Sequence, residues 1–128
     1  GSLVIVERNT GSLLRSYSGH QHCCYNTESS FLFDDMFVCT GSEDGVLYTF
    51  DVLSGLMSGY QLHSQGIASL STHVPIASTI YPLLPQNTAS KGKGSTLGAA
   101  AQSTFVATSS YDGEACLWEV VPSRHAVQ

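Results

Sequence analysis

The segment TGSEDGVLYTFD at residues 40–51 decides the fold of this chain, because TSSYDGEACLWE at residues 108–119 repeats its pattern. Both segments carry a Thr, a Ser, an Asp-Gly pair, an aromatic residue and an acid at the same offsets. An Asp-Gly pair between apolar runs predicts a tight hairpin turn, since Gly tolerates the positive φ that such turns require. Each segment is therefore expected to form two antiparallel strands joined at its Asp-Gly pair.

A third, truncated copy of the repeat lies upstream at residues 3–11. It matches residues 47–55, because in both segments an apolar run ends in an acidic residue and the turn that follows ends in Gly. The closing acids Glu7 and Asp51 are 44 residues apart, whereas Asp51 and Glu119 are 68 residues apart. A period of roughly 40–45 residues is typical of repeat architectures. The longer second interval therefore indicates an insertion in the last copy.

Residues 85–102 are the predicted insertion, because they are low in complexity and lack hydrophobic periodicity. We expect them to form a flexible loop between the first two strands of the last copy, after residues 67–74 and before residues 104–108. Residues 75–84 either begin this insertion or extend the sheet.

The middle copy contains four predicted strands with turn signals between them. These strands are residues 24–31, 36–40, 46–52 and 56–62. Four antiparallel strands per repeat are the blade of a β-propeller. The sequence thus predicts an all-β fold made of about two to three such blades, a part of a propeller.

The composition of the chain disfavours nucleic-acid binding and a membrane-spanning segment. The chain has 128 residues, of which 42% are hydrophobic and 12% charged, and a net charge of −5. No Lys or Arg occurs between residues 16 and 90, while six acids do, so the field repels phosphates and direct nucleic-acid binding is not expected. No apolar run is long enough to cross a membrane, and no signal peptide is recognisable.

Four cysteines, Cys23, Cys24, Cys39 and Cys116, lack the regular spacing of a secreted disulfide framework. This distribution predicts a reducing compartment, the cytoplasm, the nucleus or both.

The repeated residues resemble those of WD-repeat β-propellers. The matching positions are Gly19-His20, Thr40, Asp44-Gly45 and Phe50-Asp51 in the middle copy, and Thr108, Asp112-Gly113 and Trp118-Glu119 in the last. In that family the His, the Ser or Thr, the Asp and the Trp form a hydrogen-bonded set. The resemblance implies Trp118 as indole donor, Thr108 as bridging hydroxyl and Asp112 as buried acceptor, with His20, Thr40 and Asp44 in the matching roles one repeat earlier.

Two positions depart from the family pattern. Phe50 stands where the Trp is expected and has no N–H, and the last copy has Leu62-His63 in place of Gly-His. The resemblance divides the chain into the last strands of a preceding repeat (1–18), a complete repeat (19–62), a final repeat interrupted near 75–103 (63–121) and a tail (122–128).

Residues 9–74 also resemble the final repeats of the mitogen-activated protein kinase organiser family, a WD-repeat scaffold associated with spliceosomes as well. That resemblance implies partners among signalling kinases or mRNA splicing factors. A closed propeller needs about four to eight blades, so we expect these repeats to need further blades, or self-association, to complete one.

Several short motifs contain residue types that are found in metal or catalytic sites. Four side chains that can bind metals lie close together in the sequence, namely His20, His22, Cys23 and Cys24. Adjacent cysteines do not easily face one ion. We therefore interpret His20 as a hydrogen-bonding residue and the cysteines as small buried residues. Residues 91–96 fail the phosphate-loop pattern, and no G-x-S-x-G elbow occurs. We therefore expect neither enzymatic activity, nor a cofactor, nor a metal site.

The predicted function is a non-catalytic protein-interaction scaffold, and the alternative is a self-associating propeller fragment that completes its ring with another chain. In a propeller the turns at Asp44 and Asp112 lie on the same rim as the connection after His20. Tyr111, Glu43 and His22 are the residues expected to contact partners there, Tyr111 above all because Tyr is enriched at binding hot spots.

Overall fold

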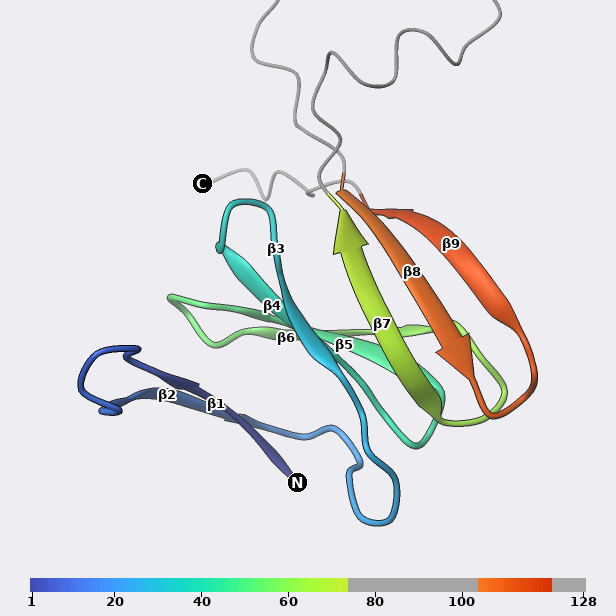
Figure 1. Cartoon of the computed structure of the whole chain (residues 1–128), viewed down its shortest axis with the longest axis horizontal. Coiled ribbons are helices and arrows are strands. Elements are labelled where there is room, and N and C mark those ends of the chain that lie inside the picture. The colour runs from blue at the N-terminus through green and yellow to red at the C-terminus, as the bar shows by residue number, and fades with distance from the viewer. Residues whose placement is uncertain (74–103, 121–128) are drawn as a thin grey trace, which may run out of the picture.

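The computed structural model describes residues 1–73 and 104–120, which form nine β-strands and no helix. The strands lie in three antiparallel sheets, each built from consecutive strands (Figure 1). Their bounds are β1 Ser2–Val6, β2 Leu13–Ser18, β3 Ser29–Leu32, β4 Phe37–Gly41, β5 Val46–Asp51, β6 Met57–Gln61, β7 Ile67–His73, β8 Thr104–Ser110 and β9 Ala115–Val120. The predicted all-β class is confirmed. Nothing in these two ranges is a helix that could cross a membrane.

The middle sheet has the order β3-β4-β5-β6, as expected for one complete repeat. Strands β4, β5 and β6 begin and end within a residue of their predicted bounds. The first strand differs, because β3 begins at Ser29 rather than at residue 24. The backbone N–H groups of Cys23, Cys24 and Tyr25 turn instead toward the carboxylate of Glu43, which holds this stretch as a loop.

The Asp-Gly pairs form the predicted hairpin turns, with φ of 80° at Gly45 and 87° at Gly113. Gly45 is required for space as well as for its conformation. A Cβ at that position would lie 2.2 Å from the carbonyl oxygen of His63. The turn between β4 and β5 therefore packs directly against the connection that leads from β6 to β7.

The outer two sheets are smaller than the middle one. One contains β1 and β2, and the other has the order β7-β8-β9. β7 and β8 are antiparallel neighbours, although the chain between them runs over residues 74–103. The predicted insertion at 85–102, residues 75–84 and the tail at 122–128 lie outside the described residues.

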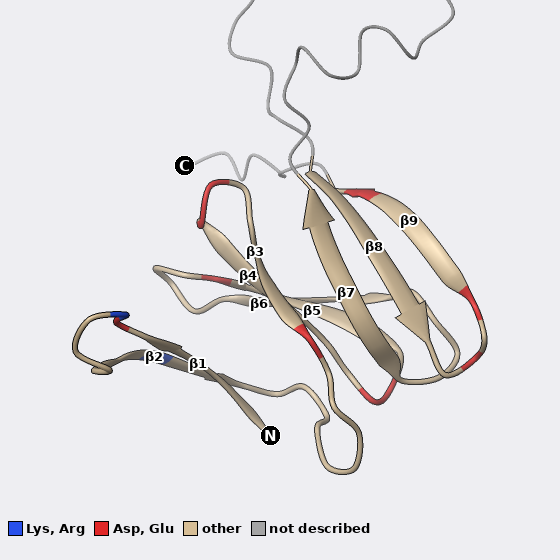
Figure 2. Ribbon diagram, viewed as in Figure 1, with Lys and Arg blue, Asp and Glu red and all other residues tan. Residues whose placement is uncertain are grey.

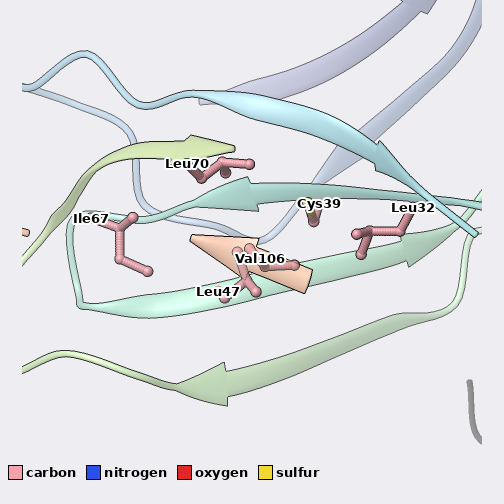
Figure 3. Close-up of a cluster of buried hydrophobic side chains, with 6 residues drawn as sticks. All are labelled: Leu32, Cys39, Leu47, Ile67, Leu70 and Val106. Atoms are coloured by element: carbon pink, nitrogen blue, oxygen red, sulfur yellow. The ribbon is translucent and has the colours of Figure 1, made fainter. Parts of the chain in front are cut away.

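Two hydrophobic clusters join the sheets. The larger one lies between the middle sheet and the β7-β8-β9 sheet and consists of Leu32, Cys39, Leu47, Ile67, Leu70 and Val106 (Figure 3). The smaller one joins the β1-β2 sheet to the middle sheet through Tyr17, Val38 and Phe50. Each cluster takes side chains from two sheets, so apolar burial makes the stability of each sheet depend on its neighbour.

All four cysteines are free thiols, of which Cys23 and Cys24 are exposed. Burial raises the pKa of the Cys39 thiol to about 11, with backbone hydrogen bonds acting weakly in the opposite direction. Cys39 therefore remains protonated and serves as a small core residue. The exposure of Cys23 and Cys24 differs from the expectation that the cysteines are buried, because the loop that carries them packs on Glu43 through its backbone.

Candidate functional site

The strongest side-chain network in the described structure lies in the last repeat. The Trp118 indole Nε1 donates to Thr108 Oγ1 over 2.9 Å. The same hydroxyl lies 2.8 Å from His63 Nε2, and His63 Nδ1 lies 3.1 Å from Asp112 Oδ2. The structure thus brings Thr108, Asp112 and Trp118 together, with His63 as the link between Thr108 and Asp112.

The ionisation of Asp112 sets the direction of every hydrogen bond in this network. Burial works to raise the pKa of Asp112, but hydrogen bonds from the Glu114 and Ser64 N–H groups and from the His63 ring outweigh it and lower that pKa. A neutral imidazole with its proton on Nδ1 donates to this carboxylate and accepts the Thr108 hydroxyl at Nε2. In that tautomer all donors point one way, from Trp118 through Thr108 and His63 to Asp112.

This arrangement has the residue types of a nucleophile, a base and an orienting acid, but its hydroxyl is closed to solvent. The Thr108 side chain is 3% exposed and its oxygen is already occupied by the Trp118 indole. A hydrolytic nucleophile must reach a substrate carbonyl. The network instead fastens β8 and β9 to the connection between β6 and β7.

His63 is the member that the sequence prediction left out. Leu62 precedes it in place of the Gly of the family pattern. A usable signal was present, since His63 follows His20 by 43 residues, close to the repeat interval of 44 between Glu7 and Asp51. Position in the repeat was thus a better guide than the identity of the preceding residue.

The expected set in the middle repeat is not formed. Thr40 Oγ1 donates to the backbone oxygens of Glu28 and Gly41. Asp44 accepts from the Val46 N–H and from the Tyr48 hydroxyl. His20 is buried, and its Nδ1 has no hydrogen-bond partner within the described ranges.

Three exchanges explain this difference. Phe50 supplies no N–H and packs its ring 6.3 Å from that of His20. The Tyr48 hydroxyl occupies an oxygen of Asp44 at 3.1 Å. The N–H of Gln21 donates to Ser42 Oγ over 2.9 Å, whereas the corresponding N–H in the last repeat, that of Ser64, donates to the carboxylate of Asp112.

The predicted partner-contact residues lie around the loop of residues 21–28. A single oxygen of Glu43, Oε1, accepts the backbone N–H groups of Cys23, Cys24 and Tyr25 over 2.6–2.9 Å. These hydrogen bonds lower the pKa of Glu43, the one from Tyr25 most strongly, so the carboxylate remains charged. His22 is exposed and pairs with Thr27 through Nδ1 over 3.0 Å. Glu43 therefore has a structural duty that the sequence prediction did not include.

Tyr111 lies across from this loop on the neighbouring sheet. Its ring packs on that of Tyr25, with ring centres 4.8 Å apart and planes tilted by 39°. Both side chains remain half exposed, at 51%. Tyr25 was not predicted as a contact residue, and nothing in the local sequence singled it out.

The metal-binding potential of the described residues is limited. Donor atoms of His63, Glu114 and Cys116 lie within 4.8 Å of one another. Both ring nitrogens of His63 are, however, engaged by Asp112 and Thr108. An ion would have to break the network, so the closeness of these three side chains is better explained by the packing of the His63 connection against the β8–β9 hairpin.

Comparison with known proteins finds two curated relatives. The chain is 33% identical over 73 residues to the WD repeat domain-containing protein 83 homolog of Dictyostelium discoideum, an alignment that covers 56% of this chain and 22% of the relative. It is 37% identical over 51 residues to an uncharacterized WD repeat-containing protein of Schizosaccharomyces pombe, which covers 40% of this chain and 17% of that protein.

No family model matches the chain, and no solved structure matches it. The chain spans about a fifth of the length of the curated relatives it matches. The antiparallel sheets of two, four and three strands each follow the order of the chain. The chain is thus similar to WD-repeat proteins over part of its length, and its all-β sheets are consistent with blades of a partial β-propeller.

Proposed function

We propose that this chain is a non-catalytic protein-interaction scaffold whose contact surface is the rim around Tyr25 and Tyr111. The observation that carries the proposal is the pair of half-exposed tyrosine rings, which come from two neighbouring sheets and pack on each other in the open. Exposed aromatic side chains held in place by their surroundings are typical of binding hot spots.

The scaffold below this pair is well fixed. The network of Trp118, Thr108, His63 and Asp112 holds the β8–β9 turn that carries Tyr111. Glu43 holds the loop that carries Tyr25. A surface that is ordered before binding loses little conformational entropy when a partner arrives.

The partners that we propose are signalling kinases or mRNA splicing factors, and the compartment is the cytoplasm, the nucleus or both. The resemblance of residues 9–74 to the organiser family supports the choice of partners. Four free thiols, two of them exposed, support a reducing compartment.

The test is affinity purification of the tagged full chain from cells, followed by mass spectrometry. We expect kinase-cascade components or splicing factors to co-purify, and Tyr111→Ala to lose them. Tyr60→Ala is the matched control, because Tyr60 is 49% exposed on β6 and does not belong to the rim. Identical partner sets for the wild type and Tyr111→Ala, or no stoichiometric partner, would contradict the proposal.

A second candidate function is self-association, in which the chain completes its ring with another copy. Within the described residues β1 pairs only with β2 and β9 only with β8, so each leaves one edge unpaired. A cavity of about 250 Å³ opens between β1 and the β3–β4 pair, and Leu117 on β9 is 69% exposed. Unpaired strand edges beside apolar surface favour association with another chain.

Light scattering after size exclusion tests this candidate. A mass that rises with concentration from one copy to two or more supports self-association. A single-copy mass at all concentrations, together with one cooperative unfolding transition, contradicts it.

A further inference from the structure

The rim around Tyr25 and Tyr111 is a built surface rather than two adjacent side chains. The Tyr25 N–H donates to Glu43 Oε1 over 2.9 Å, and the Tyr111 N–H donates to the Gly66 oxygen over 3.1 Å. Gly66 lies close to Glu43, since a Cβ on Gly66 would be 3.2 Å from the Glu43 Cα. Four separate segments of the chain therefore meet at the rings. We call this surface, formed by Tyr25, Glu43, Gly66 and Tyr111, the tyrosine rim.

The charge around the tyrosine rim is negative, and no Lys or Arg lies near it in the part of the chain that the structure describes. The acids at this end of the sheets are Glu28, Glu43, Asp44, Asp112 and Glu114 (Figure 2). The described basic residues, Arg8 and Arg15, lie on the β1–β2 hairpin, and Arg15 donates to the Leu53 oxygen over 2.6 Å. The rim therefore carries a net negative field, which the N-terminal ammonium beside His22 offsets only in part.

Two of these carboxylates have unused oxygens. Glu43 accepts its three N–H groups through Oε1, and its Oε2 accepts no hydrogen bond within the described ranges. Glu114 is exposed, and no donor among the described residues bonds to its carboxylate. Glu43 bonds the backbone of Tyr25, so its free oxygen offers an acceptor close to that residue. The Glu114 carboxylate lies instead within 4.8 Å of ligand atoms of His63 and Cys116.

We propose that the tyrosine rim binds an arginine-bearing basic segment of a partner protein, with the guanidinium over the tyrosine rings and its N–H groups directed to Glu43. This inference rests on the proposed function and adds the chemistry of the partner. A guanidinium is planar, stacks on aromatic faces and donates hydrogen bonds in a fixed fork, so it matches a surface of rings beside a carboxylate. A lysine ammonium carries the same charge but is not planar, so it cannot stack on a ring in this way.

The same features disfavour other macromolecules. Phosphate backbones and anionic lipid headgroups are repelled by the negative field. An acidic peptide is repelled for the same reason. A basic segment is attracted, and its affinity should fall as salt concentration rises.

The test uses a short fluorescein-labelled peptide of alternating glycine and arginine, and a lysine peptide of equal length and charge. Binding to the full chain is measured by fluorescence anisotropy. We expect the arginine peptide to bind more tightly than the lysine peptide. Tyr25→Ala and Tyr111→Ala should each weaken its binding roughly two- to fivefold, the range expected for loss of one exposed cation–π contact.

Two further variants separate recognition from folding. Tyr111→Phe keeps the ring and should keep most of the affinity, and Tyr60→Ala should leave it unchanged. Far-UV circular dichroism and the fluorescence of Trp118 show that each variant retains the fold. Equal binding of the two peptides, or equal losses with Tyr60→Ala and Tyr111→Ala, would overturn the inference.

The purification experiment distinguishes the two proposals. If Tyr111→Ala loses its protein partners but the arginine peptide does not bind, the partner chemistry is wrong and the scaffold proposal stands. If the peptide does not bind and the partner sets are unchanged, both are wrong.

Discussion

The middle and last repeats carry the same pattern of His, Thr, Asp-Gly and an aromatic residue, yet only the last one connects these side chains. In the last repeat, hydrogen bonds run without interruption from Trp118 to Asp112. In the middle repeat, Thr40 and Asp44 bond elsewhere and His20 Nδ1 stays without a partner among the described residues. The comparison shows that a hydrogen-bonded set depends on all of its members, because one missing donor allows neighbours to capture the others.

The two sheets also differ in how much they need such a network. The middle sheet has four strands and contributes to both hydrophobic clusters. The described part of the last sheet has three strands and contributes to one cluster. The middle sheet is packed on both faces and therefore gains more stability from apolar burial. The absence of a polar network should therefore reduce its stability less than it would reduce that of the last sheet.

The largest expected effect is that of Thr108→Val compared with Thr40→Val. Thr108→Val removes the group that joins His63 Nε2 to Trp118 Nε1, and leaving buried partners unsatisfied costs about 2 kcal/mol. Thr40→Val loses only a hydrogen bond to backbone oxygens, and we expect about 1 kcal/mol. Urea unfolding of the full chain, followed by Trp118 fluorescence, measures both. If both substitutions lowered the free energy of unfolding equally, the hydrogen bonds of the two repeats would contribute equally to stability. That result would contradict the difference between the repeats.

The next largest effect is expected from Trp118→Phe, a substitution that gives the last repeat the Phe that the middle repeat has at residue 50. Trp118→Phe removes the indole N–H while keeping an aromatic ring, and we expect it to lower the free energy of unfolding by about 1 kcal/mol, one hydrogen bond. Far-UV circular dichroism must follow this unfolding, because the chain contains a single Trp. In the Thr108→Val background the same exchange should cost clearly less. Additive losses would show that the indole acts independently of the network.

A smaller effect is expected from Tyr48→Phe in the middle repeat. It removes the hydroxyl that occupies Asp44, a partly exposed hydrogen bond worth about 0.5 kcal/mol. Cys116 stands at the corresponding position of the last repeat, so Cys116→Ser is a control for a polar change that leaves the network intact. If Tyr48→Phe stabilised the chain, the freed Asp44 would be shown to prefer another donor, and His20 would be the candidate.

The smallest expected effect is a pH dependence that belongs to His20. Burial lowers the pKa of His20 below its ordinary value of 6.5, helped by the positive N-terminus and His22 and opposed by Asp44. Below pH 6.5 the unfolded state therefore binds more protons than the folded state, and the free energy of unfolding falls as the pH falls. Stability attributable to His20 is fully present above pH 6.5 and is lost as the pH drops through its folded pKa.

His20→Leu is the matched variant for this measurement. We expect its unfolding midpoint to change less between pH 7 and pH 5 than that of the wild type. The carboxylates whose pKa values are lowered act in the same direction, but only below their ordinary values, 4.5 for Glu28 and Glu43 and 3.8 for Asp51 and Asp112. An unchanged pH dependence in His20→Leu would contradict the assignment.

Several predictions from sequence were confirmed by the structure because they depend on local chemistry. The Asp-Gly pairs at residues 44–45 and 112–113 predicted hairpins, and alternating apolar runs beside them predicted strands. The predicted start of the first strand of the middle repeat, residue 24, was wrong, because β3 begins five residues later at Ser29. The backbone N–H groups of residues 23–25 bond the distant carboxylate of Glu43, which holds this stretch as a loop.

The sequence by itself determined the period, the turns and the strands of the repeats, because Gly conformation and the two-residue alternation of a strand act over a few neighbouring residues. Only the tertiary structure decided which polar groups meet. His63 reaches Asp112 across 49 positions, Tyr25 packs on Tyr111, and Asp44 bonds Tyr48 rather than His20. Each of these donors and acceptors has several candidate partners in the sequence, and distances of about 3 Å in the folded chain select one.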